Sequence, residues 1–124
     1  MGETFQYPWK RIELIEYIRE LADFSYQRQH WMNPEEGKIV GISPIIDFLL
    51  IDQALDVDPE GAVGLYILQS EVKTVRDVAT GLSNVVRNIR DQYDSEGALN
   101  DPFWPQLVLR AKLALSILET RNIP

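Results

Sequence analysis

An apolar stripe at helical spacing limits the possible folds of this chain more than any other feature of its sequence. Eight apolar residues between positions 72 and 93 lie within an arc of about 140° on a helical wheel of about 100° per residue. They are Val72, Val75, Val78, Leu82, Val85, Val86, Ile89 and Tyr93. The stripe predicts a long amphipathic helix that packs its apolar side against other helices.

Helix-start signals divide the rest of the chain. Three dipeptides combine an N-cap residue with a proline that fits the first turn of a helix: Ser43-Pro44, Asp58-Pro59 and Asp101-Pro102. Together with the apolar periodicity, these signals predict helices over about 8–21, 23–31, 44–55, 59–68, 71–93 and 102–121. We expect a polar linker at 94–100, and the last helix is apolar on so many sides that other helices should bury it.

No strand-like alternation of useful length, internal repeat or low-complexity tract interrupts these segments. A chain of 124 residues has the size of one domain and can bury a core without disulfides. We therefore predict an all-α fold, an irregular bundle of five or six helices in a single domain over residues 1–124.

Composition narrows the cellular location and the cofactors. The chain has no cysteine and one histidine, so it offers neither disulfides nor thiolate metal sites. Its N-terminus lacks the apolar segment of a signal peptide, and the apolar stretch 45–55 is interrupted by Asp47 and Asp52 and too short to span a bilayer. We expect a cytoplasmic protein without a cofactor.

The chemistry-bearing motifs of enzymes are missing from the sequence. There is no catalytic triad pattern, no zinc-binding H-E-x-x-H and no phosphate-binding glycine loop. Residues 56–61 begin like a calcium loop, but Ile67 stands where a bidentate glutamate must close the coordination sphere. We expect no catalytic residue and no metal site, and we keep an enzyme or small-molecule binder as a lesser alternative.

Charge is distributed unevenly along the chain. The formal net charge is −7, and residues 1–62 hold five Lys/Arg against twelve Asp/Glu, whereas residues 63–124 hold seven of each. An acidic surface repels nucleic-acid phosphates and attracts basic proteins. The competing interpretation is that the acidity only keeps the protein soluble.

Two further features are relevant to binding. The cations Lys73, Arg76, Arg87 and Arg90 share one side of the 71–93 helix, where ion pairs are a better interpretation than contact with nucleic acid, because acidic residues border them. Most aromatic residues should lie in the core, but four lie next to prolines or loops, where an exposed ring can anchor a partner. These four are Tyr7, Trp9, Trp31 and Phe103.

One residue pattern carries a resemblance to known proteins. It comprises Tyr7-Pro8, Arg11, Glu13, Ile15, Ile18, Leu21-Ala22-Asp23, Tyr26-Gln27-Arg28, Trp31 and Asp101-Pro102-Phe103-Trp104-Pro105. The pattern resembles a group of small bacterial helical proteins and, more distantly, the all-helical immunity proteins of contact-dependent growth inhibition systems. The resemblance implies a cytosolic inhibitor that covers the RNA-binding cleft of a basic nuclease toxin.

Charge and resemblance together predict an acidic immunity protein whose partner is a basic toxin domain, most simply a ribonuclease. The alternative is a helical interaction or regulatory module with no toxin partner, including a homodimer built on the flank of the 71–93 helix. Charge and expected exposure alone select the candidate contact residues. They are Asp52, Asp56, Asp58, Glu60, Glu35 and Glu36, with Asp91, Asp94, Glu96 and Asp101 as a second patch.

Overall fold

The computed structural model describes residues 5–31 and 41–121, and within these ranges every regular element is a helix. The α-helices are α1 (Pro8–Leu21), α2 (Phe24–Tyr26), α3 (Ser43–Ile46), α4 (Val72–Val86), α5 (Ser95–Leu99) and α6 (Trp104–Arg121). Gln27–Trp31 and Asp47–Asp52 continue α2 and α3 as π-helical turns, and Pro59–Ala62 and Gln69–Glu71 are 3₁₀ turns. The predicted all-α bundle is confirmed.

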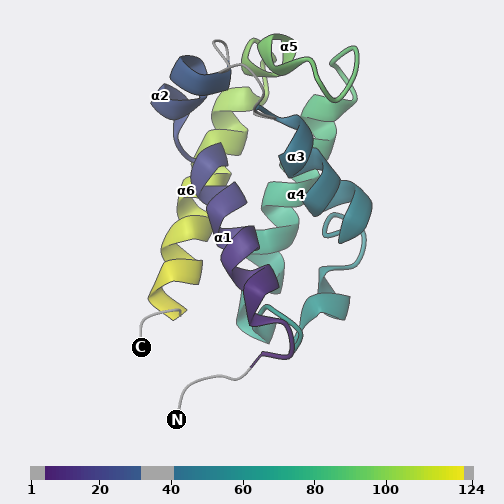
Figure 1. Ribbon diagram of the computed structural model, residues 1–124, viewed down its shortest axis with the longest axis vertical. Helices are drawn as coiled ribbons and strands as arrows, with labels where there is room; N and C mark the ends of the chain where they lie inside the picture. Colours follow the sequence, from purple (N-terminus) through teal and green to yellow (C-terminus); the bar gives the residue numbers. More distant parts are fainter. Residues whose placement is uncertain (1–4, 32–40, 122–124) are drawn as a thin grey trace.

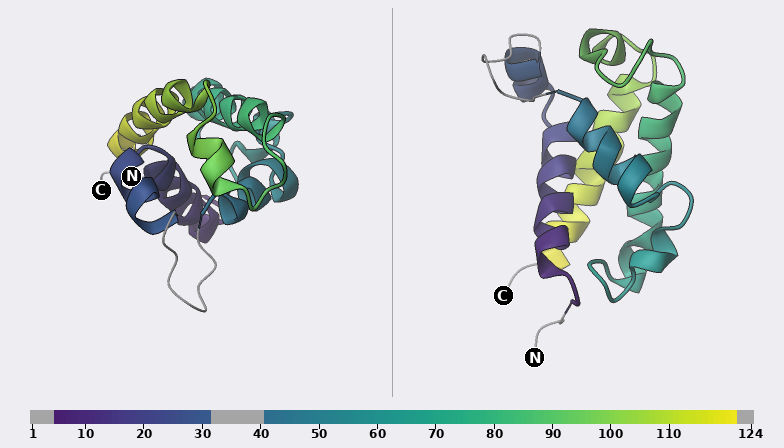
Figure 2. Two further views of the ribbon diagram at one scale, coloured as in Figure 1. Left: turned by 90° about the horizontal axis from the view of Figure 1, so that it is seen from above. Right: turned by 45° about the vertical axis from the view of Figure 1, so that its right-hand side comes forward.

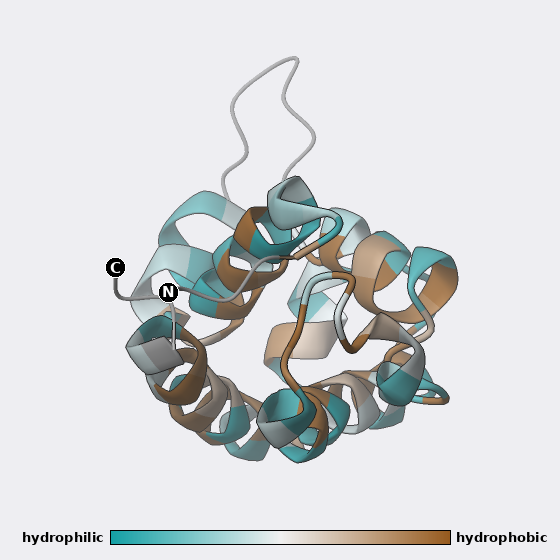
Figure 3. Ribbon diagram, turned by 90° about the horizontal axis from the view of Figure 1, so that it is seen from below, coloured by the Kyte–Doolittle hydropathy of each residue, from teal (hydrophilic) through white to brown (hydrophobic). Residues whose placement is uncertain are grey.

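Four helical segments surround a single core (Figures 1 and 2). Seen along the bundle, α1, α6, α4 and the α3 segment form a ring, and α5 covers one end of it. Figure 3 shows the same ring from the opposite end. Helix α6 packs against both α1 and α4, so it lies between them. The largest fully buried apolar side chains come from every segment of the ring, for example Leu14, Leu49, Leu82 and Leu107.

Contrary to our expectation, helix α6 is not buried on most sides. The side chains of Leu109 and Leu113 on its outer side are 64% and 61% exposed. Its inner side carries Leu107, Ala111, Ala114 and Leu118, all almost completely buried against the core. A helix with neighbours on two flanks still presents one face to solvent, and its apolar composition did not reveal which residues lie there.

Three predicted helices are shorter in the structure. The 44–55 helix ends at Asp52, and Ala54 follows with a left-handed backbone, at a φ of 48°. The 59–68 helix is only the Pro59–Ala62 turn, because Gly64 adopts a φ of 82° and starts a tight loop. The 71–93 helix begins at Val72 and ends at Val86. Beyond it, carboxylates of Asp91 and Asp94 accept backbone N–H groups that an extended helix would use itself.

Helix α5 lies in the segment that we had predicted as a polar linker. Asp94 caps it, because its side chain accepts a hydrogen bond from the Gly97 amide at 3.0 Å. Ser95, the first helical residue, accepts the Ile42 amide at 3.2 Å and so ties α5 to the start of the α3 segment. A short helix with one buried residue, Ala98, has too weak an apolar pattern to be recognised from sequence.

Asp101 closes the turn before α6. Its carboxylate accepts the Phe103 amide at 2.8 Å, and only 7% of the residue is exposed. We predict that Asp101→Ala lowers the free energy of unfolding by about 1 kcal/mol, the usual net contribution of one intramolecular hydrogen bond. Urea unfolding monitored by circular dichroism checks this value. Asp52→Ala is the matched control, because Asp52 is exposed and should change stability by less than about 0.5 kcal/mol.

Candidate partner-binding surface

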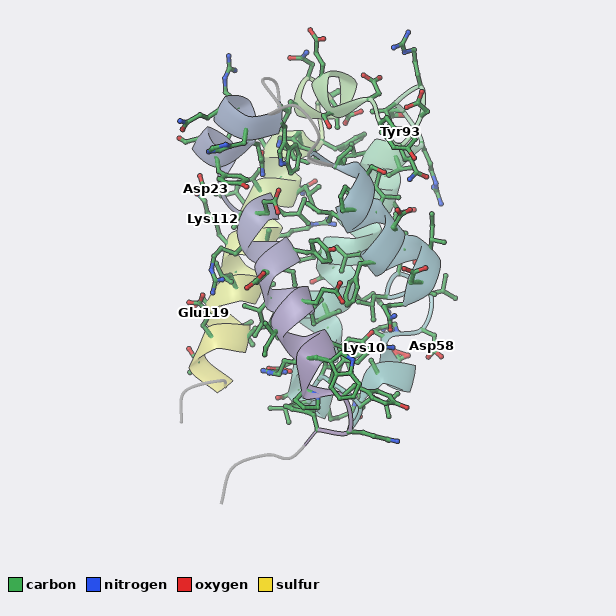
Figure 4. All side chains as sticks on the ribbon, viewed as in Figure 1. Lys10, Asp23, Asp58, Tyr93, Lys112 and Glu119 are labelled. Carbon is green, nitrogen blue, oxygen red and sulfur yellow. The ribbon has the colours of Figure 1, made fainter. Side chains whose placement is uncertain are left out.

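The first predicted acidic patch is only partly available to a partner. The Asp58 carboxylate accepts the Gly61 amide at 3.2 Å, and the Glu60 carboxylate pairs with Arg76, with 2.7 Å between Oε2 and Nη2. Figure 4 labels Asp58 on the side of the molecule away from α6. Within the described residues, Asp52 and Asp56 form no side-chain hydrogen bond or ion pair, so they remain candidates. Glu35 and Glu36 lie outside the described residues.

The second predicted patch consists mainly of carboxylates with structural roles. Asp91 accepts the Tyr93 amide at 2.8 Å, and the buried Asp101 accepts the Phe103 amide. The backbone N–H groups of Gly97 and Arg90 lower the pKa of the Asp94 carboxyl that they contact. Glu96 is exposed and is the one member without a hydrogen bond or ion pair to the described residues. The other three carboxylates keep their charge, but hydrogen bonds to the backbone occupy oxygens that a partner would otherwise contact.

The cations predicted to share one side of the 71–93 helix lie on α4 and in the segment after it, and most of them form ion pairs within the molecule. Arg76 pairs with Glu60, Lys73 pairs with Asp77 at 2.9 Å, and Arg90 lies 3.9 Å from the Asp94 carboxylate. These contacts agree with the ion-pair interpretation of this row and leave Arg87 as its exposed member without an ion pair to the described residues. The row is not a continuous basic track.

The most prominent acidic row lies on α1, which our sequence selection left out. Glu13, Glu16 and Glu20 follow one another at steps of three and four residues, within an arc of about 60° on the helical wheel. Asp23 follows just after the helix, where its carboxylate caps α2 by accepting the Tyr26 amide at 3.0 Å. Glu13, Glu16 and Asp23 are exposed and Glu20 is partly buried. The opposite side of α1 holds the buried apolar residues, so this row faces outward. Its helical spacing is present in the sequence, but the net charge of a segment does not show which carboxylates share a helix face.

Two large apolar side chains share this outward side of α1. Trp9 and Ile12 are each 60% exposed, and the ring of Trp9 packs edge-on against Tyr7 with 5.3 Å between the ring centroids. Trp9 was one of the four aromatic candidates, whereas Trp31, another of them, is buried at 5% exposure. We call the six residues of this side the α1 face. It consists of Trp9, Ile12, Glu13, Glu16, Glu20 and Asp23.

Negative charges from α1 and from the turn that continues α3 act together on Tyr17. The Tyr17 hydroxyl has a raised pKa, chiefly because it is partly buried and then because the charges of Glu13, Glu20 and Asp47 oppose its ionisation. Asp47 belongs to the turn that continues α3, and the Tyr17 ring contacts Phe48 there at 5.3 Å between centroids. Three carboxylates from two elements therefore act on one point of the surface.

Glu20 is anchored at the upper end of the α1 face. Its carboxylate accepts the Trp31 indole N–H at 2.8 Å, and burial raises its pKa despite that hydrogen bond. Beside it, Glu16, Arg19, Asp23 and Tyr26 line a hollow of about 250 Å³. Arg19 is held at the edge by an ion pair with Glu119 at 2.8 Å. The carboxylates that line the hollow are therefore accessible to a cationic side chain of a partner protein.

The fold and the comparison with known proteins establish the class and the family of this protein. The described residues form one all-α domain, and none of their helices has the length and hydrophobicity needed to cross a membrane. The same residues contain no group of three or more His, Cys, Asp or Glu placed to hold a metal ion. The chain belongs to the family described as a domain of unknown function, DUF7945, which matches residues 5–123. No curated protein and no solved structure matches it.

Proposed function

We propose that this protein binds a basic protein through its α1 face and neutralises it, without catalysing a reaction. The observation that supports the proposal most strongly is the combination of three α1 carboxylates and the adjoining Asp23 with two exposed apolar side chains on one side of the molecule. Such a face pairs a long-range attraction for cations with a hydrophobic anchor. Under this proposal the partner is a nuclease toxin of a bacterial growth inhibition system, and inhibition takes place in the cytoplasm.

The mechanism of neutralisation follows from the charges. A ribonuclease binds the RNA backbone with Lys and Arg side chains, and the carboxylates of the α1 face can occupy the same cations. Acidic steering accelerates association, and the effect weakens as salt screens it. Trp9 and Ile12 then contribute burial that does not depend on salt. The inhibitor and RNA would therefore compete for one cleft.

Charge reversal on the α1 face tests the location of the site. We predict that Glu13→Lys with Glu16→Lys weakens binding to the basic nuclease domain at least about 100-fold, mainly through slower association. The partner to use is the C-terminal domain of the secreted effector expected next to this gene. Surface plasmon resonance at several salt concentrations gives both rate constants.

The control for this pair changes the same total charge elsewhere. Asp52→Lys with Glu96→Lys alters two exposed carboxylates outside the α1 face and should reduce affinity by less than about tenfold, through the general field alone. If this control pair abolished binding while the α1 pair did not, the docking surface would lie on our original candidate patches. Failure of both wild-type and control proteins to bind a basic domain would contradict the proposed function itself.

A further inference from the structure

The outer side of α6 forms a second surface, distinct from the α1 face. Six exposed residues of this 18-residue helix lie within an arc of about 100°, and none of them is charged. We call this set the α6 face. It consists of Pro105, Gln106, Leu109, Leu113, Ser116 and Thr120. Leu109 and Leu113 at its centre are more than 60% exposed, so the strip exposes much of its hydrophobic surface.

Charges border the α6 face in a self-complementary order. Lys112 and Glu119 lie on the same edge, and Figure 4 shows both along the side of the molecule where Asp23 also lies. They are seven residues apart, so they are separated along the helix but share nearly the same direction on the helical wheel. Lys112 has no ion pair with the described residues, and Glu119 pairs with Arg19.

We propose that the α6 face binds a second copy of this chain, with the two α6 helices antiparallel. In a two-fold arrangement every contact occurs twice, and each edge of the face meets the same edge of the other copy. A two-fold axis between Leu113 and Ser116 sets Lys112 of each copy opposite Glu119 of the other. The same register packs Leu113 of each copy against Ile117, which is partly exposed.

Electrostatics favour a second copy over another partner on this surface. Residues 63–124, which include α4 and α6, contribute no net charge, whereas residues 1–62 account for the whole formal charge of −7. Two copies can therefore meet through α6 with little charge in the contact itself. A basic partner gains nothing from an uncharged strip, whereas Lys112 and Glu119 at its edge match the same two residues of a second copy. The net charge of −7 on each copy opposes association and keeps the dimer weak, and the two α1 helices, which lie beside this edge, are on the same side of the dimer.

The size of the surface sets the expected affinity. Helix α6 is about 27 Å long at about 1.5 Å per residue and about 10–12 Å wide, so it presents roughly 300 Å² in projection. A stable complex usually buries about 800 Å² per partner. The α6 strip is less than half of that area, so we expect a weak, transient dimer.

Sedimentation velocity over about 5–500 µM tests the association. The mass should rise from 14.3 kDa towards twice that value. Leu113→Lys should raise the dissociation constant at least about 100-fold, because it places a charge in the desolvated centre of the interface. Val57→Lys is the control, since Val57 is 76% exposed and lies outside α6, and it should leave the constant within about twofold. A mass of 14.3 kDa at every concentration would overturn the proposal.

Charge exchange tests the antiparallel register. Lys112→Glu alone and Glu119→Lys alone should each weaken the dimer about three- to tenfold, because each sets like charges opposite one another. The double variant should bind more tightly than both single variants, although it still lacks the Glu119 partner of Arg19 within each chain. Ser116→Cys adds a second test, since this residue lies near the two-fold axis and the chain has no other cysteine. Mild oxidation should link Ser116→Cys chains but not Val57→Cys chains, and a double charge variant weaker than both single variants would exclude this register.

Discussion

Glu71→Ala should lower the free energy of unfolding by about 3–5 kcal/mol, the cost of leaving one member of a buried ion pair without its partner. Glu71 is fully buried, and its carboxylate receives both Nη atoms of Arg11 at 2.9 and 2.8 Å. It also accepts the Leu68 amide at 2.8 Å, which caps the turn before α4. The change therefore leaves a buried guanidinium and a backbone amide without their acceptor. Urea unfolding gives the difference.

Arg11 makes this loss larger than that of a simple pair. Its guanidinium also donates to the Tyr66 and Leu118 carbonyls at 3.1 and 3.3 Å, so it joins α1 to the end of α6 and to the loop before α4. A double-mutant cycle of Arg11 and Glu71 should show a coupling energy of at least about 2 kcal/mol. The exposed Lys73–Asp77 pair is the control and should couple by less than about 0.5 kcal/mol. Equal coupling in both cycles would contradict this role.

Trp104→Ala is expected to cost a similar amount, about 3–5 kcal/mol, as for other large side chains removed from a core. Trp104 is 1% exposed, and its ring meets Trp31 edge-on with 5.8 Å between centroids. Its indole N–H donates to the Gln27 side chain at 2.9 Å, and Gln27 in turn donates to the Glu20 and Leu21 carbonyls. The substitution opens a cavity and leaves a buried amide oxygen unpaired.

Thermal and urea unfolding of Trp104→Ala should be compared with Trp9→Ala. Trp9 is 60% exposed, so its removal should change stability by less than about 0.5 kcal/mol. Comparison of the two variants separates effects on folding from effects on binding, because only Trp9 belongs to the α1 face. If Trp9→Ala unfolded as easily as Trp104→Ala, the exposed anchor assigned to α1 would be wrong.

The fold could be predicted because its main signals are local. The stripe of α4 and the proline at the start of α1 depend on residues within a few turns of one another. The ends of helices depend instead on single side chains that capture backbone amides, as Asp91 and Asp94 do after α4. Such carboxylates interrupt a helix without changing the apolar pattern, so the predicted boundary at residue 93 was wrong.

The candidate site was harder to predict, because charge alone does not show what a carboxylate contacts. Asp101 and Asp52 have the same chemistry in the sequence, yet one is a buried cap and the other is exposed. The resemblance pattern had a related limit. Its residues Arg11, Gln27, Trp31 and Trp104 form the buried polar and aromatic contacts that hold α1, α2 and α6 together. They describe the framework of the fold, whereas the acidic row of α1 was visible in the sequence as a helical spacing and only its exposure beside Trp9 and Ile12 required the three-dimensional structure.

Calorimetric titration of the protein into the C-terminal domain of the effector that we expect to be encoded beside it, with a parallel assay of RNA cleavage, tests the central claim most directly. At about 0.15 M salt we predict a one-to-one complex and loss of cleavage, with affinity falling steeply as salt rises towards about 1 M. Glu13→Lys with Glu16→Lys should remove both effects and leave helicity unchanged. The absence of binding at the lower salt concentration, or binding that leaves RNA cleavage intact, would contradict the proposed inhibition.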